Sequence, residues 1–109
     1  MGTNPIEASV ALISEKLNND PTITLIDVRE ESERELCFIQ GSIRLTEALA
    51  EEIIGSWQPD TELVFYCHHG IRSRAAAEYF LKQGFKNVFN MTGGIEAWSL
   101  LIDTQVPRY

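Results

Sequence analysis

The feature that most constrains the fold is a nearly continuous apolar run in the middle of the chain, Leu63 to Cys67 (Leu-Val-Phe-Tyr-Cys). A strand that is buried on one face alternates apolar and polar residues, whereas a strand buried on both faces is apolar throughout. Strands of the second kind lie at the centre of parallel sheets that helices cover on both sides. The run therefore predicts a central strand of an α/β fold.

The rest of the chain alternates in the way that this fold requires. Strands are predicted at 22–28, 63–67 and 87–91, with a shorter one within 39–45. Helices are predicted from Pro5 to about residue 17, at 46–54, at 73–83 and after 93–94, with a short exposed helix or turn at 30–35. Strands separated by helices favour three layers, with a mostly parallel central sheet and helices on both of its faces.

Several helix boundaries have local signals. Asn4 is the predicted N-cap of the first helix, with Pro5 in its first position and Glu7 three residues after the cap. Thr46 is the predicted N-cap of the helix at 46–54. Gly84 stands where a helix ends in the left-handed conformation.

The composition is that of a globular protein with a single domain spanning residues 1–109. Hydrophobic residues make up 44% and charged residues 23% of the 109, and there is no repeat or linker. The net charge of −7 argues against a nucleic-acid or anionic-membrane partner. The N-terminal residues lack the basic and apolar regions of a secretion signal, and no apolar run is long enough to cross a bilayer, so we expect a cytoplasmic protein.

The charge is unevenly distributed. Residues 1–66 carry four basic and thirteen acidic side chains, a net −9, and residues 67–109 carry five basic and three acidic ones, a net +2. A locally positive segment in an acidic protein suits a small anion, although a solvated acidic face explains the same count equally well.

Cys67 occupies the position that would make a cysteine reactive in such a sheet. It ends the predicted central strand, where open α/β sheets bind ligands, and a helix begins near Ser73. The N–H groups of a helix start and of a curled loop, together with Arg72 and Arg74, favour a thiolate over a thiol. Gly70 gives such a loop its backbone freedom.

Two other interpretations of Cys67 have to be weighed. A cysteine at the end of a buried strand is most often a small hydrophobic residue. Cysteine phosphatases share the order strand, cysteine, loop, arginine and helix, but five residues separate their cysteine from their arginine. Here four residues separate Cys67 from Arg72, namely His68, His69, Gly70 and Ile71. A loop shortened by one residue should hold something smaller than phosphate, such as a single sulfur atom.

Three segments in the expected order resemble the rhodanese family of sulfurtransferases. They are Leu-Ile-Asp-Val-Arg-Glu at 25–30, Phe-Tyr-Cys-His-His-Gly-Ile-Arg-Ser at 65–73 and Gly-Gly-Ile-Glu-Ala-Trp at 93–98. Residues 37–42 match less well, since only Ile39 and Gly41 agree with the family's usual Gly-His-Ile-Pro-Gly-Ala. This departure indicates a locally different pocket rim.

The resemblance implies a two-step transfer of sulfur with no cofactor and no metal. Cys67 would take the outer sulfur of a small anionic donor such as thiosulfate and then pass it from a persulfide to a thiol, which can belong to a protein, or to cyanide. The backbone of residues 68–73 would stabilise the persulfide. Arg72 would either orient the donor or hold the loop, and His68 and His69 would lie on the pocket rim.

The remaining motif residues are assigned structural roles. Asp27 and Arg29 are expected to brace neighbouring loops as an ion pair, Gly93-Gly94 to allow a turn, and Trp98 to fill the core. Cys37 is expected to be buried rather than to resolve a persulfide, and neither cysteine has the spacing of a metal site.

Two alternative functions remain open at this stage. The domain could be a persulfide carrier or regulatory binding module that acts on a protein partner. Less probable is a cysteine phosphatase or an arsenate reductase, because the interval between Cys67 and Arg72 is one residue too short.

Overall fold

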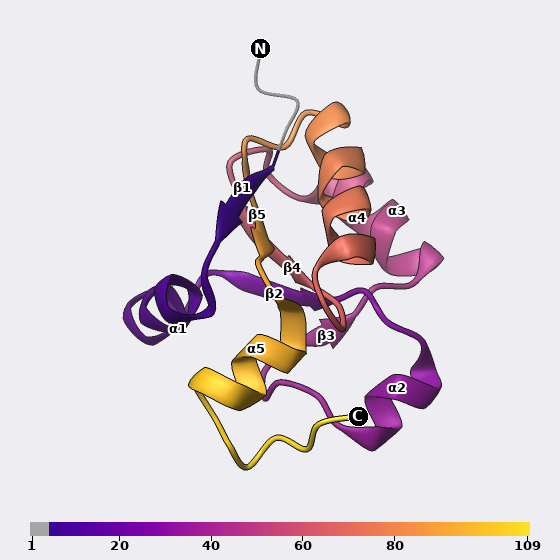
Figure 1. Ribbon diagram of the computed structural model, residues 1–109. Helices are drawn as coiled ribbons and strands as arrows, with labels where there is room; N and C mark the ends of the chain where they lie inside the picture. Colours follow the sequence, from indigo (N-terminus) through magenta and orange to yellow (C-terminus); the bar gives the residue numbers. More distant parts are fainter. Residues whose placement is uncertain (1–4) are drawn as a thin grey trace.

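The computed structural model describes residues 5–109, which form one five-stranded parallel sheet with helices packed on it (Figure 1). The strands are β1 (Ile6–Ala8), β2 (Thr24–Asp27), β3 (Ile43–Arg44), β4 (Glu62–Tyr66) and β5 (Asn87–Met91). The helices are α1 (Val10–Asn19), α2 (Glu31–Leu36), α3 (Glu47–Ser56), α4 (Ile71–Lys82) and α5 (Gly94–Leu101). The strand order is β1-β5-β4-β2-β3, and every pairing is parallel.

The predicted central strand is confirmed. β4 pairs with β2 on one side and β5 on the other, and its residues from Leu63 to Tyr66 are fully buried. Its side chains divide between two cores. Val64 and Tyr66 pack under α1 and α5, whereas Leu63 and Phe65 pack under α3 and α4.

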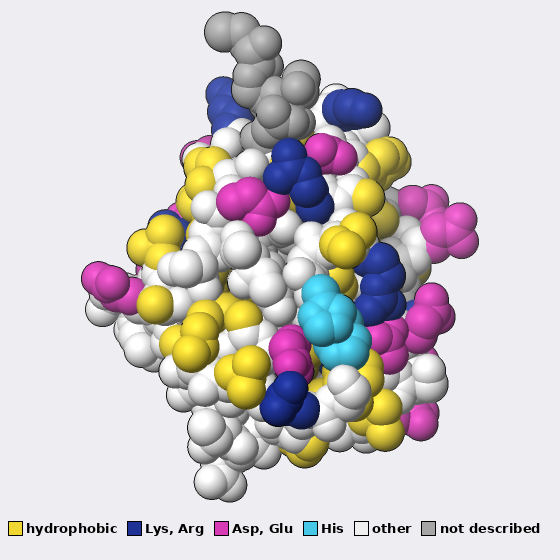
Figure 2. All heavy atoms as spheres, in the orientation of Figure 1, with side chains coloured by type: hydrophobic (Ala, Val, Ile, Leu, Met, Phe, Trp, Pro, Cys, Tyr) yellow, Lys and Arg dark blue, Asp and Glu magenta, His cyan; other side chains and the backbone are white. Residues whose placement is uncertain are grey.

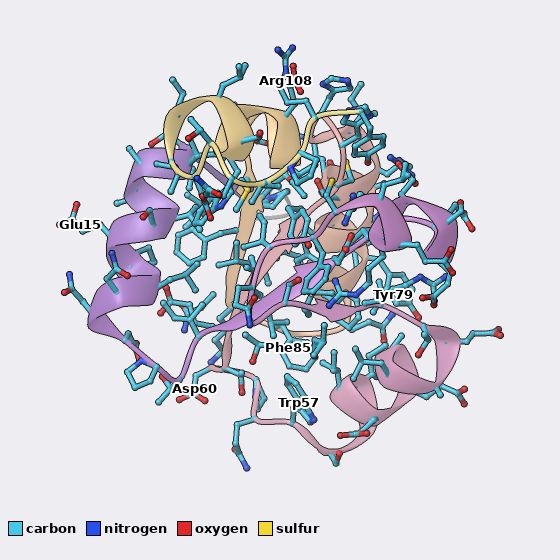
Figure 3. The ribbon with its side chains drawn as sticks, turned by 90° about the horizontal axis from the view of Figure 1, so that it is seen from below. Glu15, Trp57, Asp60, Tyr79, Phe85 and Arg108 are labelled. Atoms are coloured by element: carbon cyan, nitrogen blue, oxygen red, sulfur yellow. The ribbon has the colours of Figure 1, made fainter. Side chains whose placement is uncertain are left out.

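The two cores lie on opposite faces of the sheet, which gives the predicted three layers. In Figure 1, α1 and α5 lie on one side of the strands and α3 and α4 on the other. Trp57 and Phe85 point toward the second of these cores in Figure 3. In α5, Ile95 and Trp98 are buried, whereas Leu101 is 73% exposed at the end of the helix.

The predicted N-terminal helix is wrong in its first turn. Ile6 to Ala8 form β1, which pairs with β5, and the helix begins only at Val10. Ser9 is its N-cap, since its hydroxyl accepts the N–H of Leu12 at 3.1 Å. The proposed cap Asn4 lies outside the described residues. The free edge of β5 offers backbone groups that these three residues satisfy, and this long-range pairing outweighs a local capping pattern.

Other boundaries follow the local signals. Thr46 caps α3 by accepting the N–H of Leu49 at 3.1 Å, and Gly84 follows α4 with a left-handed φ of 102°. α4 begins two residues earlier than predicted, at Ile71, because Gly70 adopts the cap position directly after the loop. No helix within residues 5–109 has the length and apolar character needed to cross a membrane.

Candidate active site

The loop between β4 and α4 lies at the carboxyl edge of the sheet (Figure 1). It runs from Cys67 to Gly70, whose φ of 100° is a conformation that only glycine adopts at little cost. A Cβ on Gly70 would also lie 3.2 Å from the carbonyl oxygen of Met91. The loop is therefore folded tightly against the end of β5.

The sulfur of Cys67 lies at the centre of this loop. Cys67 is 1% exposed, and its Sγ accepts hydrogen bonds from Gly70 N at 3.1 Å, Ser73 N at 3.4 Å and Ser73 Oγ at 3.3 Å. Burial raises the pKa of the thiol, but bonds from the Ser73 hydroxyl and from the N–H groups of Ser73, Gly70 and His69 lower it by more. The net pKa of Cys67 is below its ordinary value, which favours the nucleophilic thiolate.

The start of α5 also supports the loop. The N–H groups of Ile95 and Glu96 donate to the carbonyl oxygens of Cys67 and His68, at 2.9 and 3.2 Å. A Cβ on Gly94 would lie 2.5 Å from the carbonyl oxygen of Cys67 and 2.6 Å from the carbonyl carbon of His68. Gly94 thus does more than allow the predicted turn, because it lets the helix contact the cysteine loop directly.

Asn90 supports the loop from β5, and sequence reasoning missed it. Its Oδ1 accepts the Ser73 hydroxyl at 2.6 Å, and its Nδ2 donates to the carbonyl oxygen of Gly70 at 3.0 Å. Asn90 is only 2% exposed. The available signal was an amide within an otherwise apolar strand, since a buried polar group needs partners.

Arg72 is directed toward α2. Its guanidinium forms two hydrogen bonds with the Glu33 carboxylate, at 2.7 and 2.9 Å, and its side chain is 46% exposed. The bond from Arg72 holds the pKa of Glu33 far below its usual range, and the same bond raises the pKa of Arg72. This geometry ties the loop to α2.

His68 is partly buried and His69 is exposed, and the two follow Cys67 in the loop. Their rings stack at 4.0 Å, and the His68 ring also stacks on Tyr109 at 3.9 Å. The two histidines form one patch on the surface in Figure 2, with acidic and basic side chains beside it. Burial and the neighbouring His69 lower the pKa of His68, which keeps its ring neutral near pH 7. Ile71, the first residue of α4 after the loop, is 80% exposed.

The positive character expected of residues 67–109 is largely cancelled in space. Acidic side chains approach three of its arginines at 2.6 to 2.7 Å, in the pairs Arg72–Glu33, Arg74–Glu7 and Arg108–Glu96. Arg108 lies beside α5 in Figure 3. Two of the three acids come from the strongly acidic first part of the chain. Charge counted along the sequence therefore overstated the local attraction for an anion.

Asp27 and Arg29 form the expected ion pair. Arg29 donates from Nε and one terminal nitrogen to the two Asp27 oxygens, each at 2.8 Å, and both side chains are fully buried. Arg29 also donates to the carbonyl oxygen of Cys37 at 2.7 Å and to the hydroxyl of Tyr109 at 3.1 Å. The pair thereby joins the end of β2 to the segment after α2 and to the C-terminal residues.

The two other structural assignments agree with the geometry. Trp98 is 8% exposed and belongs to the core under α1 and α5. Cys37 is a free cysteine, 6% exposed, in the same core. Among residues 5–109, no three His, Cys, Asp or Glu side chains are grouped closely enough to hold a metal ion.

The sequence model described as "Rhodanese-like domain" matches residues 9–101, which is most of the chain. This chain belongs to the rhodanese-like domain family. The resemblance found in three short motifs is thus confirmed over nearly the whole domain.

The rhodanese-like fold and the sulfurtransferase group are both supported by individual relatives. "Thiosulfate sulfurtransferase GlpE" of Pseudoalteromonas translucida is 30% identical over 92% of this chain and 94% of its own length. "Putative sulfur carrier protein YrkF" of Bacillus subtilis is 32% identical over 85% of this chain and 50% of its own length, and the chain spans only 30% of another curated relative. A solved rhodanese-like domain protein from Staphylococcus aureus, 20% identical, covers 95% of this chain and 98% of its own, with a TM-score of 0.75.

Proposed function

We propose that this domain is a sulfurtransferase that moves sulfane sulfur from a small donor such as thiosulfate to a thiol or cyanide through a persulfide on Cys67. The observation that carries the proposal is the position of the Cys67 sulfur. Cys67 directly follows β4, and its sulfur accepts hydrogen bonds from the N–H groups of Gly70 and Ser73. The name of its GlpE relative supports thiosulfate as the donor.

In the first step, the Cys67 thiolate attacks the outer sulfur of thiosulfate. A bond forms between the two sulfur atoms, and the bond from the outer to the central sulfur of thiosulfate breaks. Its electron pair leaves with sulfite, and the negative charge remains on the terminal sulfur of the persulfide. Backbone N–H groups that already point into the loop, at Gly70 and Ser73, lie where they can stabilise that charge.

In the second step, an acceptor thiolate or cyanide attacks the terminal sulfur. The sulfur–sulfur bond of the persulfide breaks, and its electron pair returns to Cys67 as a thiolate. No proton has to be removed from either attacking group once it is ionised. The stacked rings of His68 and His69 fit this chemistry, since neither ring is hydrogen-bonded to the Cys67 sulfur.

The first test is the mass of the intact protein after incubation with thiosulfate. We expect a gain of one sulfur atom on the wild-type chain, which a thiol acceptor then removes, and no gain on Cys67→Ser. A Cys37→Ser variant that labels and turns over normally would show that Cys37 takes no part. Wild-type protein that gains no sulfur from any sulfane donor, or that hydrolyses an aryl phosphate only while Cys67 is present, would contradict the proposal.

Arg72 provides a second prediction, because the sequence left two roles for it. We infer that it holds the loop through Glu33, so Arg72→Gln and Glu33→Gln should lower kcat/KM for thiosulfate by a similar factor, about three- to fivefold. The effect is modest because solvent screens a pair whose side chains are 46% and 18% exposed.

The alternative role, in which Arg72 binds the donor, predicts that Glu33→Gln changes kcat/KM for thiosulfate in the opposite direction. If Arg72 bound the donor, Glu33→Gln would release the guanidinium and lower KM for thiosulfate. Steady-state kinetics of both single variants and the double variant distinguish the roles, since a shared ion pair makes the two effects non-additive. Lys16→Gln, which removes an ion pair with Glu62 on another part of the sheet, is the matched control.

A persulfide carrier that serves a protein partner is the second candidate, and the name of the YrkF relative favours it. The exposed Ile71 beside the buried sulfur would give such a partner an apolar contact. Slow transfer to small thiols and to cyanide, combined with rapid transfer to one protein thiol, would favour the carrier over the enzyme.

A further inference from the structure

A hydroxyl with a single hydrogen lies between two acceptors beside the reactive sulfur. Ser73 Oγ is 3.3 Å from Cys67 Sγ and 2.6 Å from Asn90 Oδ1. Ser73 is fully buried and Asn90 is 2% exposed. Because a serine hydroxyl donates only one hydrogen bond, the sulfur and the amide oxygen compete for it whenever the sulfur is a thiolate.

The orientation of the Asn90 amide is fixed by its other end. Its nitrogen lies 3.0 Å from the carbonyl oxygen of Gly70 and 3.0 to 3.1 Å from the two carboxylate oxygens of Glu7. Both partners only accept, so the nitrogen must face them and the oxygen must face Ser73. Glu7 is itself held by Arg74 and by the hydroxyl of Thr92, at 2.6 and 2.9 Å.

The two ionisation states of Cys67 place different demands on this chain of hydrogen bonds. The thiol can donate to Ser73 Oγ while the hydroxyl donates to Asn90, so every group has a partner. The thiolate has no hydrogen to give and needs one instead. The Ser73 hydrogen can turn to the sulfur only if the buried Asn90 oxygen is left without a donor, which is unfavourable.

We propose that Asn90 is a positioning residue that competes with Cys67 for the hydroxyl hydrogen of Ser73 and so limits how strongly the thiolate is stabilised. The benefit for catalysis rests on the proposed sulfur transfer. A thiolate that is less stabilised is more nucleophilic, and the first step depends on its attack on the donor. Asn90 thus balances the fraction of thiolate against the reactivity of that thiolate.

Other charged groups surround the sulfur and remain unchanged in the test. Glu7 comes from β1, Arg72 and Arg74 from α4, and Glu33 from α2. The loop contributes His68 and His69, α5 contributes Glu96 beside them, and Tyr109 stacks on His68. None of these side chains accepts the Ser73 hydrogen. Asn90→Leu also removes the bonds from the amide nitrogen to Glu7 and to Gly70 O, so the double variant with Ser73→Ala is needed to separate that loss from the competition.

The test is the pH dependence of alkylation of Cys67 by iodoacetamide, followed by peptide mass mapping so that Cys37 does not contribute. We expect Ser73→Ala to raise the pKa of Cys67 and Asn90→Leu to lower it, each by about one unit, a tenfold change in the thiolate-to-thiol ratio. In Ser73→Ala/Asn90→Leu, the effect of the second substitution should disappear because no hydroxyl remains. Asn87→Leu, the same change at an exposed position of β5, should leave the pKa unchanged.

A merely structural role gives a different pattern. If Asn90 only held Gly70 in place, Asn90→Leu would loosen the loop and raise the pKa of Cys67, with or without Ser73. A raised or unchanged pKa, or a fall that persists in the double variant, would overturn the proposal. Asn90→Ala, checked by circular dichroism, replaces Asn90→Leu if that variant does not fold. Alkylation uses no sulfur donor, so failure here and failure of the sulfur-transfer test are separate results.

Discussion

Arg29→Ala is expected to destabilise the fold by about 3–5 kcal/mol, because it leaves the buried Asp27 carboxylate without its bidentate partner. Both side chains are fully buried in the wild-type protein. Arg34 and the Tyr66 hydroxyl still donate to Asp27, at 2.9 and 3.0 Å, but they reach only one of its oxygens. Urea denaturation followed by circular dichroism measures the loss. Arg108→Ala, at an exposed ion pair with Glu96, should leave the midpoint nearly unchanged.

A double variant tests whether the cost comes from the Asp27 charge that has lost its bidentate partner. Arg29→Ala/Asp27→Asn should be more stable than Arg29→Ala alone, since a neutral amide is cheaper to bury without an ionic partner. Arg29→Lys should give an intermediate loss, because an ammonium group cannot make the two parallel bonds of the guanidinium. Equal stability of Arg29→Ala and wild type would show that the pair contributes only local order.

The parts of the fold that the sequence predicted are those with a strong local or periodic signal. The apolar run of β4, the caps at Thr46 and Gly84 and the strand at Asn87–Met91 each depend on residues within one element. β1 was missed because three residues gain their structure only by pairing with β5, whose edge is distant in the sequence. A propensity pattern at the N-terminus could not anticipate that partner.

In the candidate site too, the contacts between sequence neighbours could be predicted, whereas the contacts between distant residues could not. Cys67, Gly70 and Ser73 are neighbours in the sequence, so their order alone indicated a sulfur surrounded by backbone donors. The partners of this loop come from far away. Glu33 lies 39 residues before Arg72, and Asn90 lies 17 residues after Ser73. Such contacts depend on the strand order, which the sequence did not specify, so the pairing of Arg72 could not be predicted.

Contacts that are distant in the sequence also decide which glycine matters most. Within residues 5–109, five glycines have positive φ values, and the local pattern treats them alike as turn formers. Around Gly41 and Gly84, nothing lies within 4 Å of an added Cβ, whereas Gly94 faces the backbone of the cysteine loop. The difference appears only once α5 is packed against the end of β4.

Gly94→Ala is therefore expected to lower kcat/KM more than the replacement of any other of these glycines by alanine. Its Cβ would lie 2.5 Å from the carbonyl oxygen of Cys67, and backbone atoms on both sides cannot yield as a flexible side chain would. Relief requires α5 to move away, which breaks the bond from Ile95 N to that oxygen. A displacement of about 1 Å at the sulfur should lower kcat/KM about a hundredfold.

Gly84→Ala is the matched control, since it introduces the same methyl group at a left-handed position in open space. It should cost about 1–2 kcal/mol of stability from backbone strain and leave the turnover of the folded protein unchanged. Steady-state kinetics below the unfolding transition compare the two variants directly. Gly94→Ala could instead retain wild-type kcat/KM and lose no more stability than Gly84→Ala. In that case α5 can shift without disturbing the loop, and the support of Cys67 would have to be assigned to Gly70 and Ser73 alone.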